Sequence, residues 1–245
     1  MSSTVQKSEI EHFSKDAPLW WDESGPFAPL HRLNPVRLDY IKTQICSHFD
    51  RDPKDFNALE GLNILDIGCG GGLVCEPMAR MGANISGIDA DGVAIEVASD
   101  HAKQSGLEIN YQATTAEEMG GTYDIVLALE IVEHVSSIED FVASCAKLVK
   151  PGGLIIFSTL NRTPKSFALG IVAAEYILRW VPRGTHSWQK FVKPSELAKV
   201  ARQNGLKPGD ITGLIYNPLK NGFTLSKTDI DVNYLMSAKK IQEKP

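Results

Sequence analysis

A glycine-rich turn constrains this chain more than any other feature. The apolar run LNILDIG (residues 62–68) is typical of a buried strand, and four glycines between 68 and 72 end it. Asp89 follows Gly68 by 21 residues and closes the next strand-like run, NISGID (84–89). Glycines let a ligand approach the backbone closely, and a carboxylate after the second strand can accept both hydroxyls of a ribose. The pattern therefore predicts a site for a ribose-bearing cofactor.

The turn departs from the dinucleotide-binding fingerprint in one position. Leu73 stands where the pattern G-x-G-x-x-G requires its third glycine. This disfavours hydride transfer from a nicotinamide dinucleotide. The plainer interpretation, a turn that needs glycine only for its backbone, is disfavoured by the presence of Asp89 at the expected distance.

Strand-like and helical patterns alternate along most of the chain. Further strand-like runs cover residues 107–112, 123–129 and 154–159, and helices are expected over 92–105 and from Ser137 to about 149. Parallel neighbours require crossover connections of this length. The sequence thus predicts an α/β fold with a doubly wound, mostly parallel, Rossmann-like sheet. Residues 211–218 and 232–240 are expected to form an antiparallel pair that closes one sheet edge.

The segment before the sheet has its own pattern, so residues 1–60 are predicted to form an N-terminal helical extension that acts as a lid. Asn34 and Pro35 mark the expected helix start. An aromatic cluster precedes it, which either folds over the site or merely packs the extension onto the core. The predicted buried stripe of the helix is Leu38, Ile41, Ile45 and Phe49, and the cluster is Trp20, Trp21, Phe27, Leu30 and His31. Residues 61–245 then form the core, with a helical insertion at about 161–190.

Charge and cysteine content narrow the function. The net charge of −5 provides no basic excess for a nucleic-acid backbone, so no nucleic-acid partner is expected. The four cysteines form no CxxC pair, which argues against a zinc site or a disulfide framework and fits a reducing, cytoplasmic location. The N-terminus is acidic rather than Arg-rich, so a mitochondrial matrix location would require a presequence already removed.

No stretch of the sequence is long and apolar enough to span a bilayer. Residues 167–182 are apolar around most of a helix, however, and Lys165, Arg179 and Arg183 stand near its ends. Such a segment suits peripheral contact with an inner membrane through residues 165–183. A buried helix that roofs the substrate site, or an oligomer contact, explains the same pattern equally well.

The core motifs resemble those of class I S-adenosylmethionine-dependent methyltransferases. The resemblance rests on LDIGCGGG (65–72) with Asp89, YDIVLALEIVEHV (123–135) and LVKPGG (148–153). It implies S-adenosylmethionine bound across the carboxyl ends of the first, second and fourth strands. The implied cofactor contacts are Gly68 and Gly70 at the methionine moiety, Asp89 at the ribose, Ala116 and Glu117 near the adenine, and the backbone of Leu129.

Segments outside the core resemble the ubiquinone biosynthesis O-methyltransferase family. They are WWDESGPFAPLHRLNPVRLDYI (20–41), STLNRTPKS (158–166), AAEYILRWVPRGTH (173–186), ITGLIYNP (211–218) and DVNY (231–234). This resemblance implies a polyprenylated catechol or demethylubiquinol as acceptor, and a complex with other enzymes of the pathway as a further partner. It also implies that Arg37 contacts the cofactor through the cofactor's carboxylate. The alternative, a solvated helix charge, is the less favoured interpretation even on spacing alone.

Three polar residues follow the fourth strand, where an acceptor facing the methyl group would lie. Glu130, Glu133 and His134 have the i, i+3, i+4 spacing that places side chains on one side of a helical turn. As catalytic residues they would activate a phenol, because a phenol is mostly protonated at neutral pH. They would either hold Mg²⁺ that polarises the catechol oxygens, or act without metal as structural groups and a His134 base.

Two other functions stay open on the sequence alone. One is methyl transfer to another small phenol, or to a nitrogen or carbon nucleophile, which the family-like flanking segments disfavour. The other is a non-catalytic scaffold that binds the cofactor and organises pathway enzymes, which the intact glycine turn and Asp89 disfavour.

Overall fold

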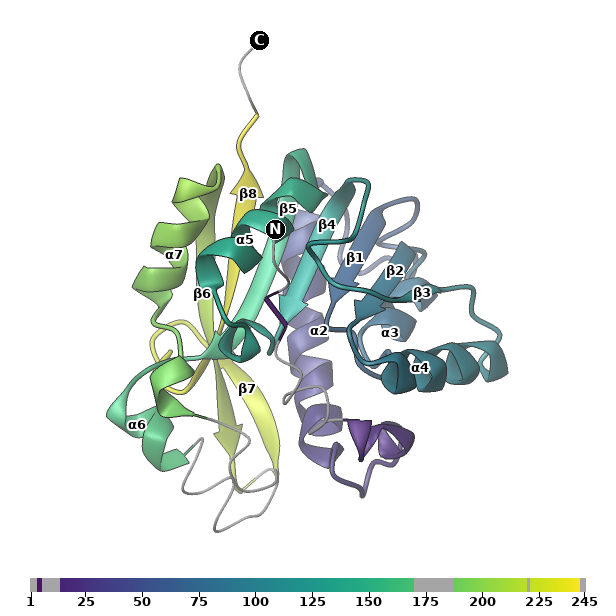
Figure 1. The fold of residues 1–245 in the computed structure, drawn as a ribbon, viewed down its shortest axis with the longest axis horizontal. Coiled ribbons are helices and arrows are strands. Elements are labelled where there is room, and N and C mark those ends of the chain that lie inside the picture. Colours follow the sequence, from purple (N-terminus) through teal and green to yellow (C-terminus); the bar gives the residue numbers. More distant parts are fainter. Residues whose placement is uncertain (1–3, 6–13, 170–186, 220, 243–245) are drawn as a thin grey trace.

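The computed structural model describes residues 4–5, 14–169, 187–219 and 221–242. In these residues the strands form one sheet with the order β3-β2-β1-β4-β5-β8-β6-β7 (Figure 1). The strands are β1 (Asn63–Ile67), β2 (Asn84–Asp89), β3 (Asn110–Ala113), β4 (Tyr123–Leu129), β5 (Val149–Leu160), β6 (Leu206–Asn217), β7 (Gly222–Ser226) and β8 (Asn233–Lys240). The helices are α2 (Ala28–His48), α3 (Cys75–Arg80), α4 (Gly92–Gln104), α5 (Ile138–Leu148), α6 (Pro164–Ser166) and α7 (Pro194–Gln203), with 3₁₀ turns η1 (Ala17–Leu19), η2 (Val132–His134) and η4 (Trp188–Lys190).

The predicted fold class is confirmed. Strands β1 to β5 pair in parallel, and α3, α4 and α5 lie in the connections between them. The order changes direction at β1, which lies between β2 and β4. Ligands of open α/β sheets bind beyond the carboxyl ends of the strands at such a point.

The antiparallel pair at the C-terminal side is also confirmed, but its surroundings were not foreseen. Strands β6 and β8 pair antiparallel, and β8 lies between β5 and β6 rather than at an edge. The edge strand is β7, which pairs antiparallel with β6. Its sequence, GFTLS, is too short to stand out as a period-2 pattern, and this strand was therefore not predicted.

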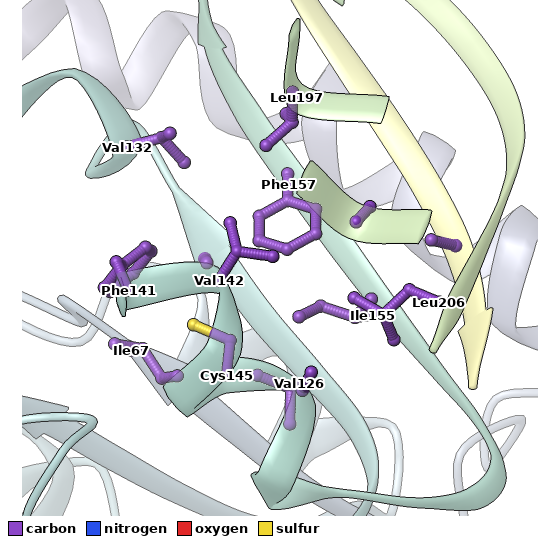
Figure 2. Packing of buried hydrophobic residues seen from close by; sticks show 14 of the residues in the cluster. Ile67, Val126, Val132, Phe141, Val142, Cys145, Ile155, Phe157, Leu197 and Leu206 are labelled. Atoms are coloured by element: carbon purple, nitrogen blue, oxygen red, sulfur yellow. The ribbon is translucent and has the colours of Figure 1, made fainter. Parts of the chain in front are cut away.

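Alternating residues of the central strands face two separate cores. On one face Ile67, Val126, Ile155 and Phe157 pack against helices α5 and α7, as Figure 2 shows. The opposite face, which includes Ile64, Leu127 and Ile156, packs against α2 and α3. Burial on both faces explains why these strands appear as continuous apolar runs in the sequence. Among the described residues no helix is long and apolar enough to cross a membrane.

The predicted start of the N-terminal helix is wrong. Helix α2 begins at Ala28 with a proline in its first turn, and it continues through Pro35. Pro29 lies in the first turn of the helix, where a proline is tolerated, so the similar signal at Pro35 was misleading. Of the predicted stripe, Ile41 and Ile45 are buried and the other two residues are half-buried, and the buried face also includes Arg37.

Candidate active site at the carboxyl edge of the sheet

The glycine-rich turn lies directly after β1 and has the backbone shape that glycine permits. Gly68 and Gly70 have φ values of 72° and 52°, in the left-handed region. The N–H of Gly68 donates to the carbonyl of Ile88 in β2 at 2.8 Å, which ties the turn to the neighbouring strand. A Cβ atom added at Gly68 would lie 2.7 Å from Cδ1 of Ile131, so a larger residue would require a left-handed backbone and a shift of that side chain.

Asp89 closes β2 and faces this turn. Its Oδ2 accepts the N–H of Gly70 at 2.9 Å, and its Oδ1 accepts the N–H of Asp91 at 2.9 Å. Burial raises the pKa of Asp89, and these two backbone donors oppose that shift by favouring the carboxylate. The structure therefore brings the two parts of the predicted cofactor motif into direct contact.

Two tryptophans of the N-terminal extension cover the turn. The indole of Trp20 lies against Gly70 and Gly71 and stacks on Phe27, with ring centroids 3.8 Å apart. Trp21 donates from Nε1 to the carbonyl of Gly71 at 3.0 Å and stacks on His101 of α4 at 3.5 Å. Residues far from the core in sequence are thus packed onto the turn.

Arg37 reaches the same place from α2. It is buried, and its Nη2 donates to Oδ1 of Asn34 at 2.9 Å, while Asn34 Nδ2 donates to the carbonyl of Leu73 at 2.7 Å. Burial lowers the pKa of Arg37, and the carboxylates of Glu130 and Asp66 oppose the shift. The solvated-charge interpretation of Arg37 does not fit this burial.

Asp66 of β1 is the buried acid beside Arg37, and it predicts a pH dependence of stability. Burial raises its pKa from 3.8 to about 7. A group whose pKa is higher in the folded state than in the unfolded state stabilises the folded protein. This stabilisation is complete at a pH below the pKa of the unfolded state, and it is lost as the pH rises through the pKa of the folded state. We expect the wild-type free energy of unfolding to fall between pH 5 and 8, by up to about 3 kcal/mol from this group, since about two pH units of the interval lie below its folded pKa of about 7 at 1.36 kcal/mol per unit.

Urea unfolding from pH 5 to 8.5 checks this expectation. Asp66→Asn, which keeps the shape and removes the charge, should make the decline shallower, and the part that remains is expected from Glu133, whose pKa is raised to a similar value. An unchanged pH slope in Asp66→Asn would show that other groups cause the decline.

The predicted adenine-side residues lie beyond β3. Ala116 is buried in the core, and Glu117 contacts the N-terminal extension through Thr4, which donates from its N–H at 3.3 Å and from Oγ1 at 2.5 Å to Glu117 Oε1. The carbonyl of Thr4 accepts the N–H of Ser136 at 2.9 Å. Leu129 ends β4 and is buried.

Glu130 follows β4 in an unusual backbone conformation. Its φ of 54° is rare for a residue other than glycine, and such conformations cluster at functional sites. Ser158 of β5 donates from Oγ to Glu130 Oε1 at 2.6 Å, and Asn233 of β8 donates from Nδ2 to Oε2 at 2.9 Å. The carboxylate is therefore fixed at both oxygens.

Glu133 lies one short turn further on, in η2, and is buried. Its Oε2 accepts the hydroxyl of Thr159 at 2.7 Å, whereas Oε1 has no hydrogen-bond partner in the described part of the chain. Burial raises the pKa of Glu133 to about 7, and the charge of Glu130 adds to this shift.

The predicted helical turn carrying all three catalytic candidates is wrong. Glu130 has a left-handed backbone and lies outside η2, which contains Glu133 and His134. Across the described ranges, no three His, Cys, Asp or Glu side chains are placed together so as to hold a metal ion. The three-ligand metal set of Glu130, Glu133 and His134 is therefore not formed, because the strained residue breaks the i, i+3, i+4 geometry.

Buried polar atoms without partners concentrate at this edge. Seven such side-chain atoms occur in the described residues. One of them, the hydroxyl oxygen of Tyr111, belongs to a residue within a strand of the parallel sheet. The others lie on α2 beside the turn, after β2, β3 and β4, or at the start of β8. They are Arg37 Nε, Asp91 Oδ2, Thr115 Oγ1, Glu117 Oε2, Glu133 Oε1 and Asn233 Oδ1. Native proteins retain few unsatisfied buried groups, so their gathering here points to a bound ligand.

Four polar residues at this edge were not singled out from the sequence. They are Asp91, Ser158, Thr159 and Asn233. Ser158, Thr159 and Asn233 lie in STLN and DVNY, two segments that already marked the family resemblance. Their role was hidden because β8 starts where β5 ends, with Leu160 opposite Asn233, and that pairing is long-range.

The segment predicted to contact a membrane, residues 165–183, falls mostly outside the described residues, and Arg179 and Arg183 are among those outside. Of its first residues, Phe167 and Leu169 are exposed. Lys165 pairs with Asp229 at 2.5 Å and with Asp231 at 3.6 Å.

Comparisons with known proteins show which family the chain belongs to. A family model described as a methyltransferase domain matches residues 38–208. Ubiquinone biosynthesis O-methyltransferases from Rhizobium leguminosarum bv. trifolii and Bartonella bacilliformis are each 54% identical to it. The alignments cover 97% of this chain and 95% of the first relative, and 98% of this chain and 98% of the second.

Solved structures agree on the fold. A magnesium protoporphyrin IX methyltransferase from Synechocystis, solved with bound S-adenosylmethionine, is 16% identical with a TM-score of 0.65, over 98% of this chain and all of that chain. A methyltransferase from Thermotoga maritima is 15% identical with a TM-score of 0.64, over 96% of this chain and all of that chain. The chain therefore belongs to the ubiquinone biosynthesis O-methyltransferase family, within the class I S-adenosylmethionine-dependent methyltransferases.

Proposed function

We propose that this carboxyl edge transfers the methyl group of S-adenosylmethionine to a ring hydroxyl of a polyprenylated catechol or of demethylubiquinol. The single observation that carries the proposal is the set of unpartnered buried atoms along the edge. These atoms have the hydrogen-bonding character that the cofactor and the acceptor require. Arg37 Nε is a donor that suits the carboxylate of S-adenosylmethionine, and the acceptor atoms after β2 and β3 suit its nucleoside. Glu133 and Asn233 lie on the acceptor side.

Methyl transfer requires alignment of the phenol oxygen with the sulfonium methyl, and loss of the phenol proton. Alignment alone supplies several kcal/mol, and up to about 7–11 kcal/mol in ideal cases. Glu130 is held by Ser158 and Asn233, so it can orient the acceptor without rearranging. Glu133, whose pKa is raised to about 7, can accept a proton near neutral pH. His134 adjoins Glu133 and stays a candidate base.

Two carboxylates at this edge are candidate ligands for Mg²⁺. The carboxylates of Glu130 and Glu133 influence each other electrostatically, and Glu133 has a buried oxygen without a partner. This pair could hold Mg²⁺, which commonly binds one or two carboxylates together with substrate oxygens, and Glu133 would then be a ligand instead of the proton acceptor. When bound there, Mg²⁺ would supply charge stabilisation for a phenolate.

Radiolabelled methyl transfer tests the function. With a synthetic short-chain prenyl catechol we expect label in the ether product, and with the late demethylquinol we expect the same. If Glu130 and Glu133 hold Mg²⁺, excess EDTA should abolish the activity and titration with Mg²⁺ should restore it. Full activity in EDTA would remove the metal role, and no transfer to either acceptor would contradict the proposed function and favour a scaffold.

We further propose that residues 1–60 act as a lid on the core formed by residues 61–245. Support comes from the two independent anchors of the extension on the turn: Trp20 against Gly70, and Trp21 on His101 and Gly71. A closed cover would exclude water from the sulfonium.

Trp21→Ala should therefore weaken cofactor binding. The loss of one stacked pair and one hydrogen bond is worth about 2 kcal/mol, which corresponds to an increase in the dissociation constant of roughly tenfold or more. Stopped-flow fluorescence should show faster release of S-adenosylhomocysteine. Trp188→Ala is the matched control, because its Nε1 bonds to the Thr163 carbonyl at 2.9 Å, away from the turn. Equal release rates in both variants and the wild type would contradict the lid.

The finer proposals on location and partners follow from the substrate. A polyprenyl acceptor resides in a membrane, so we propose a cytoplasmic enzyme with a peripheral contact through residues 165–183 and with other pathway enzymes as partners. The exposed Phe167 and Leu169 support the membrane contact. Sedimentation with liposomes, with and without residues 165–183, would separate this contact from a buried roof over the site.

A further inference from the structure

Asn233 lies at the acceptor side of the edge although it belongs to a strand near the C-terminal part of the chain. It is the first residue of β8 and pairs with Leu160, the last residue of β5. Because β8 runs antiparallel to β5, its start lies where the parallel strands end. The strand order thus brings the side-chain amide of Asn233 next to Glu130, which is 103 residues earlier in the chain.

The orientation of this amide is fixed by its neighbour. A carboxylate only accepts hydrogen bonds, so the Nδ2 side of Asn233 faces Glu130 Oε2, at 2.9 Å. The other oxygen of Glu130 accepts from Ser158 at 2.6 Å, so the carboxylate cannot turn away without losing a second bond. The Oδ1 atom of Asn233 is therefore held in place, and it is buried without a partner among the described residues.

Glu133 contributes a second oxygen of the same kind. Its Oε1 is buried and unpartnered, while Oε2 is held by Thr159, the neighbour of Ser158 on β5. Leaving an acceptor buried and unpaired costs about 1–3 kcal/mol. A ligand that brings two donors would recover both costs. A catechol carries two adjacent O–H groups, whereas a monophenol carries one.

We propose that Asn233 accepts the ring hydroxyl adjacent to the one that is methylated, and thereby selects acceptors with two neighbouring hydroxyls. This inference rests on the proposed O-methyltransferase function and adds a specificity-determining residue to it. The reacting hydroxyl is the one that donates to Glu133 Oε1, and the neighbouring hydroxyl donates to Asn233 Oδ1 and keeps its proton. Asn233 also positions Glu130 through its Nδ2.

The test compares two acceptors in the full-length enzyme: a short-chain prenyl catechol and the same ring without the neighbouring hydroxyl. Wild-type enzyme should prefer the catechol in kcat/KM by at least about 100-fold, since sites built to bind a hydroxyl reject analogues that lack it. Asn233→Ala should lower kcat/KM for the catechol at least about tenfold more than for the monophenol, because both acceptors lose the support of Glu130 but only the catechol also loses the contact with its second hydroxyl. Asn233→Ser, which keeps a small acceptor, should restore part of the preference.

Asn161→Ala is the matched control. Asn161 donates from Nδ2 to the carbonyl of Ile230 at 2.9 Å, so its loss removes a nearby structural bond. We expect this variant to keep the catechol preference. The dissociation constant for S-adenosylhomocysteine, measured by calorimetry, should be unchanged in Asn233→Ala, which shows that the cofactor site is intact.

Several outcomes would overturn the inference. A wild-type enzyme that methylates both acceptors equally would remove the need for a second hydroxyl while leaving the proposed function standing, and this result needs no variant to fold. Equal losses for both acceptors in Asn233→Ala would assign Asn233 a purely structural role, or one toward a cation. Transfer to neither acceptor by the wild type would instead contradict the proposed function itself.

Discussion

Asp89→Ala should weaken binding of S-adenosylmethionine by at least about 100-fold. A carboxylate that accepts both ribose hydroxyls makes two charge-assisted hydrogen bonds, each worth about 1.5–3 kcal/mol. Asp89 also accepts the N–H groups of Gly70 and Asp91, so its removal loosens the turn that the cofactor would contact. Calorimetric titration with S-adenosylhomocysteine measures the loss directly.

Asp124→Ala is the matched control for this experiment. Asp124 is an aspartate near the opposite, amino end of β4, where it accepts the N–H of Asn63 at 3.0 Å and pairs with Lys150 at 2.9 Å. Its removal should lower stability without changing cofactor affinity. Wild-type affinity in a folded Asp89→Ala protein would show that the cofactor binds elsewhere.

Glu133→Gln should lower kcat by about 10²- to 10⁴-fold, the usual contribution of a positioned acid or base. The substitution keeps the shape and the bond to Thr159 but removes the charge and the proton acceptor. Cofactor affinity should be unchanged, since Glu133 lies on the acceptor side. Single-turnover methyl transfer, with the acceptor saturating, separates this effect from binding.

The stability of Glu133→Gln provides a second, independent readout. The pKa of Glu133 is raised to about 7, so its favourable contribution is present below its ordinary pKa and is lost as pH rises through 7. Glutamine cannot ionise, so the variant should match the wild type at pH 5 and exceed its thermal stability at pH 8. Glu196→Gln on α7, a partly exposed control, should leave kcat unchanged. A Glu133→Gln enzyme with wild-type kcat would leave Glu133 without a catalytic role.

Local signals predicted the parallel half of the fold well. β2 and β4 occupy the residues expected for them, and Ser137 accepts the N–H of Asp140 at the start of α5, as the capping pattern indicated. In each case the determining contacts lie within a few residues, or arise from burial on both faces of the sheet.

Features that depend on long-range pairing were not predicted. Nothing near Asn233 in the sequence indicates that β8 inserts beside β5, and so its contact with Glu130 was missed. The left-handed backbone of Glu130 was likewise hidden, because Ser158 stabilises it from another strand. The spacing of Glu130, Glu133 and His134 suggested a helix, and strain at one residue overrode that preference.

The place of β8 in the sheet has a consequence for how the protein is made. Until Asn233–Lys240 leaves the ribosome, the long strand β5 has no partner on one side. The roughly 70 residues between β5 and β8 take on the order of 4–14 s to synthesise at 5–20 residues per second. During that interval an apolar strand edge is open to association with other nascent chains. A chaperone that shields this edge during translation should raise the yield of active enzyme.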